Sequence, residues 1–192
     1  ESIYGYVIRK QNRHAEALPW YNKSIARLKK LPLDVQREAL VRDDLDKSYQ
    51  GRAVCLIMVK RYQEAIPDLD LVIGSVQGHD AIFVRLLRGY AHAHLGNHEA
   101  AVKNVDAAMK LPDGRKGDGL TAARIYSLSM KAVEDDRAFA GDRAPLLRRL
   151  AGAAIDALVR DRQRGGADAK TLESASDLAR LRLTPEYQDY RK

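Results

Sequence analysis

The stretch GYAHAHLGNHEAAVKNVDAAMKL, Gly89 to Leu111, decides the fold of this chain. Its Leu-Gly-Asn turn separates two segments that both have helical character, and His98 begins the second of them. Small residues stand at fixed places in the two segments, among them Gly89 and Ala101. The stretch therefore predicts a pair of helices joined by a short turn.

Two other stretches repeat this pattern, NRHAEALPWYNKSI from Asn12 and KRYQEAIPDLDLVI from Lys60. Small residues held at fixed spacing let two helix backbones approach closely, since a larger side chain would force them apart. In the three copies the small residues are Ala17, Ala65 and Ala101, preceded twelve positions earlier by Gly5, Ala53 and Gly89, and followed seven positions later by Ser24, Val72 and Ala108.

The spacing of these copies resembles the tetratricopeptide repeat, with 36 residues from Ala65 to Ala101 and 34 from Gly89 to Ala123. In the third copy, Arg85 and Arg88 stand at the positions where that family usually has a large aromatic residue and a leucine. The resemblance implies an all-α fold, a right-handed superhelical stack of helix-turn-helix repeats. We expect one domain, 1–192, with repeats at about 1–31, 34–76, 80–111 and 119–163, and a C-terminal capping helix within 167–192.

Two features of this organisation go beyond the standard repeat. A long helix is predicted from about Val35 to Lys60, with Asp34 as its cap. The chain ends in RGGADAKTLESASDLARLRLTPEYQDYRK, whose apolar residues are expected to cover the last hydrophobic face, as repeat stacks require. These residues are Leu172, Leu178, Leu181 and Tyr187.

The order of segments is similar to the tetratricopeptide regions that follow bacterial serine/threonine protein kinase domains. The similarity rests on the long second-repeat helix, the ARIYSLS segment, the inserted EDDRAFAGDRAP, and the pairs Asp177-Leu178 and Leu181-Arg182 before Pro185-Glu186-Tyr187. It implies a regulatory module of a larger signalling protein. The chain has no kinase Gly-rich loop, HRD or DFG motif, so any kinase activity would lie outside it. We expect the chain to be part of a longer one.

Three histidines between Gly89 and His98 raise the question of a metal site. His92 and His94 point to nearly opposite sides of one helix, because successive residues are about 100° apart. His94 and His98 are four residues apart, but the predicted Leu-Gly-Asn turn lies between them, so no single helix carries an i, i+4 histidine pair, and no CxxC motif is present. We therefore expect no metal and no cofactor.

The composition of the chain narrows the classes of function that remain possible. The chain is 45% hydrophobic and 31% charged, and it has no apolar run near about twenty residues that could span a bilayer. The single cysteine, Cys55, fits a reducing compartment such as the cytoplasm, and its apolar neighbours predict a buried thiol. Candidate acids come as adjacent pairs, Asp43-Asp44 and Asp135-Asp136, which do not converge as catalytic groups would. We expect no enzymatic activity.

A stack of this kind lines its concave face with the first helix of each repeat, and that face commonly receives a peptide or a helix. Aromatic residues beside cations favour a protein partner with acidic character. Tyr6 and Tyr90 could instead pack between repeats. Some tetratricopeptide domains bind the C-terminal carboxylate of a chaperone with Lys and Asn side chains. Ser2, Tyr6 and Gly51 stand at the places where that pattern needs Lys or Asn, so this binding mode is disfavoured. The predicted partner-binding residues are Tyr6, Arg9, Lys10, Gln50, Val54, Ile57, Phe83, Leu86, Tyr90, His94 and Arg124.

Two further interaction modes remain open. The net charge of +7 allows a basic helical-repeat surface that binds RNA or other nucleic acid, although no pair of base-reading residues recurs between repeats. Self-association is the other mode, because Tyr4, Val7 and Ile8 of the first helix could pair with another copy.

Overall fold

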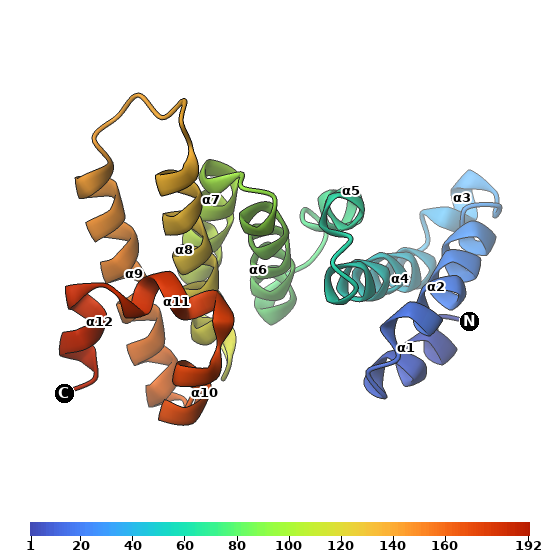
Figure 1. Cartoon of the computed structure of the whole chain (residues 1–192). Helices are drawn as coiled ribbons and strands as arrows, with labels where there is room; N and C mark the ends of the chain where they lie inside the picture. The colour runs from blue at the N-terminus through green and yellow to red at the C-terminus, as the bar shows by residue number, and fades with distance from the viewer. The chain divides into compact units, whose positions relative to one another are not determined.

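The computed structural model describes all 192 residues, and helices are its only regular secondary structure. Twelve α-helices and one short 3-10 helix, η1, follow one another without a β-strand (Figure 1). This confirms the all-α prediction. The helices group into two compact units, Glu1–Val76 and Gln77–Lys192, and the boundary lies in the connection between the second and third helix pairs. The expectation of a single domain stays a prediction.

Unit 1 contains two helix pairs. α1 packs against α2, α4 packs against α5, and α2 lies on α4, which joins the pairs. We call the leading helix of each pair its first helix and the other its second helix. The helices of unit 1 are α1 (Ser2–Lys10), α2 (His14–Leu28), α3 (Leu33–Gln36), α4 (Ala39–Met58) and α5 (Tyr62–Val72).

Unit 2 contains two more pairs and the C-terminal segment. α6 packs against α7 and α8, and α8 makes its most extensive contact with α9. The pairs are formed by α6 (Gly78–His94) with α7 (His98–Met109), and by α8 (Asp118–Asp135) with α9 (Arg143–Gln163). The segment that follows has four short helices, α10 (Ala169–Ser174), η1 (Ser176–Leu178), α11 (Ala179–Arg182) and α12 (Pro185–Tyr190).

The turn inside the first three pairs has one geometry, repeated three times. Each turn contains a residue with positive φ, namely 60° at Asn12, 63° at Lys60 and 77° at Gly96. A left-handed residue ends a helix by letting later amides reach its last carbonyls. The amide of the next residue donates to the carbonyl five positions earlier, Arg13 to Ile8 (3.3 Å), Arg61 to Leu56 (2.8 Å) and Asn97 to His92 (3.0 Å). The chain is therefore a helical-repeat protein.

A second recurring feature joins the two helices of each of the first three pairs through residues 16 positions apart. In unit 1, Tyr4 stacks on Trp20 at 5.2 Å between ring centroids. In the next pair, Nε and Nη2 of Arg52 donate to the two carboxylate oxygens of Asp68 at 2.7 and 2.6 Å. In unit 2, Arg88 donates to Asn104 at 3.3 Å. The same two places thus hold a ring stack, an ion pair and a hydrogen bond from a guanidinium to an uncharged amide.

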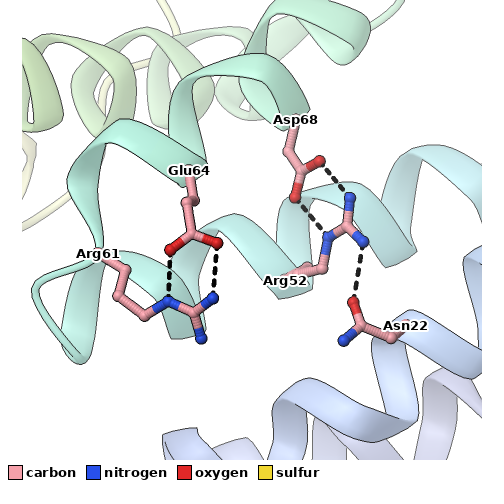
Figure 2. Close-up of polar contacts among 5 residues, drawn as sticks. All are labelled: Asn22, Arg52, Arg61, Glu64 and Asp68. Atoms are coloured by element: carbon pink, nitrogen blue, oxygen red, sulfur yellow. Dashed lines mark hydrogen bonds and ion pairs between the residues drawn. The ribbon is translucent and has the colours of Figure 1, made fainter.

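Arg52 also connects the two pairs of unit 1. Figure 2 shows its guanidinium between Asp68 of α5 and the side-chain oxygen of Asn22 on α2, 2.9 Å away. Asp68 is 3% exposed, so its charge relies on this bidentate contact. In the same view Arg61 pairs with Glu64 across the first turn of α5, where both side chains are exposed. The partly buried pair, with Asn22, therefore connects three helices.

The small residues identified from the sequence lie where helices cross. Ala17, Ala65 and Ala101 are fully buried. A Cβ at Gly89 would lie 3.2 Å from the carbonyl oxygen of Ala101. In unit 1 the Tyr21 ring packs between two glycines, and a Cβ at Gly51 would meet it at 2.3 Å. The prediction of close helix contacts at these positions is confirmed.

The helix predicted from Val35 to Lys60 is present in its larger part as α4, but it is not continuous, and Asp34 does not cap it because Asp34 lies within α3. Glu38 has extended backbone geometry and separates α3 from α4. The side-chain amide of Gln36 donates to the carbonyls of Lys29 (3.1 Å) and Leu31 (2.6 Å), which follow the end of α2. These contacts hold α3 against the end of α2, so the chain has to bend before α4 begins.

The C-terminal segment is buried as expected, but it is not one capping helix. Leu172, Leu178, Leu181 and Tyr187 are at most 6% exposed and belong to the core of unit 2. Extended residues break the segment at Ala175 and Thr184, and the Thr184 hydroxyl accepts from the amide of Tyr187 to begin α12. η1 and α11 pack on α8, and α12 packs on α9 (Figure 1).

Candidate partner-binding faces

The eleven predicted partner-binding residues all lie on first helices, divided between the two units. Unit 1 holds six of them, on α1 and α4, and unit 2 holds five, on α6 and α8. Ile57 and Leu86 are only 6% and 2% exposed, so they support the first helices from within the core. The other nine residues are at least partly accessible.

In unit 1 the face of α1 is an exposed ring between two cations. Tyr6 is 48% exposed. The Arg9 guanidinium lies 5.3 Å and the Lys10 ammonium 5.4 Å from the Tyr6 ring centroid, within the range of cation–π attraction. Arg9 also donates to the Tyr21 hydroxyl at 3.3 Å, which anchors it to the core. This face is aromatic and positively charged.

The ion pairs of unit 1 leave the two cations of this face without a carboxylate. These ion pairs join Arg13 with Glu16, Lys47 with Asp43, Arg52 with Asp68, and Arg61 with Glu64.

Beside α1, the first helix α4 adds the half-buried Gln50 and Val54. Met58, one turn beyond Val54, is 56% exposed and was not identified from the sequence. Its position four residues after Val54 on the same helix is the signal that could have found it.

In unit 2 the corresponding ring is engaged by the chain's own C-terminal segment. The Tyr90 hydroxyl of α6 donates to Asp177 of η1 at 2.6 Å. The His94 and Tyr90 rings meet in a T-shaped arrangement, 4.5 Å apart between centroids. The remaining two predicted residues differ in their surroundings, since Phe83 stacks with His79 at 6.5 Å and the Nε of Arg124 is buried without a hydrogen-bond partner.

Contacts with α8 hold the same segment in place. The Leu181 amide donates to the Ser127 hydroxyl at 3.1 Å, and Arg180 Nε donates to Glu134 at 2.7 and 2.8 Å. Leu178 and Leu181 are fully buried. The segment therefore lies against the first helix α8 and reaches α6 through Asp177. Sequence reasoning did not identify Ser127, Glu134 or Asp177 as partners, because contacts over 46 to 87 residues leave no local pattern.

His94 borders one of the cavities of unit 2. A cavity of about 470 Å³ lies between the end of α6 and the second half of α8. Its walls carry His94, Lys131 and the carboxyl groups of Asp135 and Asp136, together with Ala93, Gly96, Leu128 and Ala132. Lys131 forms an ion pair with Asp135 at 2.8 Å, so the positive charge of the wall is neutralised by one of its own carboxylates.

The titratable groups of the core have a structural role. Burial raises the pKa of the Cys55 thiol to about 11, which keeps it protonated and unreactive at neutral pH. Burial also raises the pKa of Tyr21, although its contact with Arg9 opposes this. The thiol is fully buried, as the sequence predicted.

The histidines of the Gly89–Leu111 stretch do not converge. His98 begins α7, where its Nε2 lies 3.4 Å from Asp136 and its ring meets Phe139 edge-on at 5.9 Å. The structure has no group of three or more His, Cys, Asp or Glu side chains that could hold a metal ion. The hydrogen bonds from the Ala138 amide and from His98 lower the pKa of Asp136, so His98 helps to hold the inserted loop.

α1 also carries the apolar surface that the sequence suggested for self-association. Ile3 is 75% and Tyr4 63% exposed, and Val7 is half exposed. Pairing of this surface with another copy stays a prediction.

None of the helices has the length and apolar character needed to cross a membrane. No protein-family model, curated protein or solved structure matches the chain.

Proposed function

We propose that this chain is a non-catalytic protein-interaction module that binds a partner peptide or short helix on the exposed face of its first helices. The observation that carries the proposal is the contact in unit 2, where Tyr90 of α6 and Ser127 of α8 hold a short helical segment of the chain itself. A surface of first helices that holds one such segment has the shape and hydrogen-bonding groups to hold another.

The proposed architecture is a tetratricopeptide-like right-handed superhelical stack within each unit, in which α1 and α4 line the concave face of unit 1 and α6 and α8 line that of unit 2. Its support is the repeated turn at Asn12, Lys60 and Gly96 and the small residues at the helix crossings. The similarity to regions that follow bacterial kinase domains leads us to propose a regulatory role within a larger signalling protein. A reducing compartment, the cytoplasm, fits the single buried thiol.

The proposal that the chain is not an enzyme rests on the environments of its reactive groups. The Cys55 thiol is buried and its pKa is raised, so it is a poor nucleophile. Ser127 is 1% exposed and accepts a backbone hydrogen bond from Leu181. The acids Asp43 and Asp135 are paired with lysines one helical turn away. These groups are occupied in ways that stabilise helices.

Photocrosslinking in cell lysate tests this proposal directly. A benzophenone side chain at position 6, replacing Tyr6 on α1, should give discrete crosslinks to a protein. The matched control places the same group at Ala26, an exposed position on the second helix α2. Equal crosslinking at both positions would contradict the first-helix face as the binding surface. Crosslinks that disappear with nuclease would instead support the nucleic-acid alternative.

A further inference from the structure

Tyr6 and Tyr90 occupy the same place in their helix pairs. Each follows the small residue of its first helix, Gly5 or Gly89, and each comes six positions before the left-handed residue of the turn, Asn12 or Gly96. Each also has a partner one turn later on the same helix, Lys10 at 5.4 Å or His94 at 4.5 Å. The two rings are therefore equivalent positions of one repeat.

The segment that engages Tyr90 shows which chemistry fits this position. Asp177 accepts the hydrogen bond from the tyrosine hydroxyl at 2.6 Å. Leu178 and Leu181, one and four residues later, are fully buried in unit 2. The recognised unit is thus a carboxylate followed by two leucines on one side of a helical turn.

The Tyr6 face of unit 1 lacks such a segment and differs in charge. Tyr6 is 48% exposed, and Arg9 and Lys10 stand beside it without a carboxylate. On the adjacent first helix, Val54 is half-buried and Met58 is 56% exposed, which gives apolar surface for leucine side chains. At the equivalent places in unit 2, Ala93 and His94 replace the two cations.

We infer that the Tyr6 face binds an acidic helical segment of a partner protein, in which a carboxylate is followed by leucines at the next and the fourth position. The inference rests on the proposed function and specifies the partner's chemistry. The partner carboxylate accepts from the Tyr6 hydroxyl and lies near Lys10, and the leucines pack toward Val54 and Met58. The chain's own segment suits this face less well, because Arg180 and Arg182 would add positive charge to a face that already carries Arg9 and Lys10.

A peptide titration with the full chain tests the inference. The probe is a fluorescent peptide with the sequence of residues 174–184 in which glutamates replace the two arginines, Ser-Ala-Ser-Asp-Leu-Ala-Glu-Leu-Glu-Leu-Thr. Two matched peptides serve as controls, one with Asn in place of the Asp and one with the original arginines. Fluorescence anisotropy is measured with the wild-type chain and with Tyr6→Phe, Lys10→Glu and Lys30→Glu variants.

The expected result is saturable binding that weakens about tenfold with the Asn peptide, and by a similar factor with Tyr6→Phe or Lys10→Glu. Lys30→Glu changes net charge equally but lies beyond the end of α2, so it should have little effect. Binding should also weaken with salt. A Tyr90→Phe variant identifies binding through unit 2, because only displacement of the chain's own segment would respond to it.

Absence of binding, or binding that ignores Tyr6→Phe and Lys10→Glu, overturns the inference. Binding that responds to Tyr90→Phe alone also overturns it, since the peptide would then occupy the unit 2 face. These outcomes are separable from failure of the proposed function. If crosslinks to a protein still form at position 6, the interaction role stands and only the assignment of an acidic, leucine-bearing partner fails.

Discussion

In unit 1 the Tyr6 ring is about half exposed, whereas in unit 2 the Tyr90 ring, at the same place in its repeat, is bonded to the chain's own C-terminal segment. The backbone beneath them is alike, since both helix pairs end their first helix with the same left-handed turn. The difference lies in side chains and in what the rest of the chain supplies. A helical repeat thus separates the residues that fix its geometry from those that select its contacts.

Substitutions at the helix crossings are expected to change the stability of the two units most. A Cβ at Gly119 of α8 would lie 2.1 Å from the carbonyl oxygen of Ala157, which belongs to the backbone of α9 and cannot rotate away. We expect Gly119→Ala to destabilise unit 2 by about 3 kcal/mol or more. Gly51→Ala meets the outer part of the Tyr21 ring in unit 1, which can shift, and should cost about 1–3 kcal/mol.

Urea denaturation separates these two effects. Trp20 is the single tryptophan and lies in unit 1, so its fluorescence reports that unit, and helical circular dichroism reports both. The control is Gly152→Ala on α9, where an added Cβ meets nothing within 4 Å. That change should be neutral or stabilising, because alanine favours helix over glycine. Equal stability of the Gly119 and Gly152 variants would show that the crossing is looser than described.

The C-terminal segment gives the next largest contrast. Leu178 is fully buried against unit 2, and Leu178→Ala should destabilise that unit by about 2–4 kcal/mol and leave unit 1 unchanged. Leu183, in the same segment, is 77% exposed, so Leu183→Ala should change stability by less than about 0.5 kcal/mol. Hydrogen exchange measured for α8 and α4 tests both expectations. Faster exchange in α4 with Leu178→Ala would mean that the units unfold together.

The polar pairs between first and second helices differ by a smaller amount. Asp68→Ala leaves Arg52 without its bidentate partner, but this guanidinium is 26% exposed and can gain water. We therefore expect a loss of about 2 kcal/mol in unit 1, below the value for a fully buried pair. Asn104→Ala, at the equivalent place in unit 2, removes an uncharged amide with its hydrogen bonds to Arg88 and Ala100, and should cost about 1 kcal/mol.

The variant Asp68→Asn sharpens this comparison, because it gives unit 1 the Arg–Asn combination of unit 2. Its stability should lie between those of the wild type and Asp68→Ala. Urea unfolding followed by Trp20 fluorescence measures it. A loss for Asp68→Asn as large as that for Asp68→Ala would show that the charge, and not the hydrogen bond, stabilises the contact.

The helix pairs could be predicted from the sequence because their signals are local. Glycine and alanine at fixed spacing mark the crossings, and the Leu-Gly-Asn turn marks the end of a first helix. The break at Glu38 was missed because it depends on Gln36 reaching carbonyls at the end of α2. Local propensity favours a continuous helix there, and a contact between segments overrides it.

The candidate faces were predicted only in part. Periodicity placed Tyr6 and Tyr90 on first helices, but it could not show that one is open and the other engaged. Asp177 lies 87 residues from Tyr90, and no spacing rule connects them. Ile57 and Leu86 were assigned to the same face because adjacent helical positions differ by about 100°, which is too coarse to separate a surface residue from a core residue beside it.

Cys55 provides the smallest contrast, because unit 2 has no cysteine. Burial raises the thiol pKa from 9.0 to about 11 in the folded chain. The folded state therefore holds the proton more tightly, and its stability advantage is complete below pH 9 and declines as pH rises toward 11. At pH 9.5 unit 1 should lose about 1 kcal/mol or less relative to pH 7, compared with Cys55→Ser as reference. A thiol reagent should react slowly with the native chain at pH 8 and at full rate in urea. Fast reaction without urea would mean that α4 opens readily around Cys55, and the exposed face of unit 1 would then belong to a mobile helix.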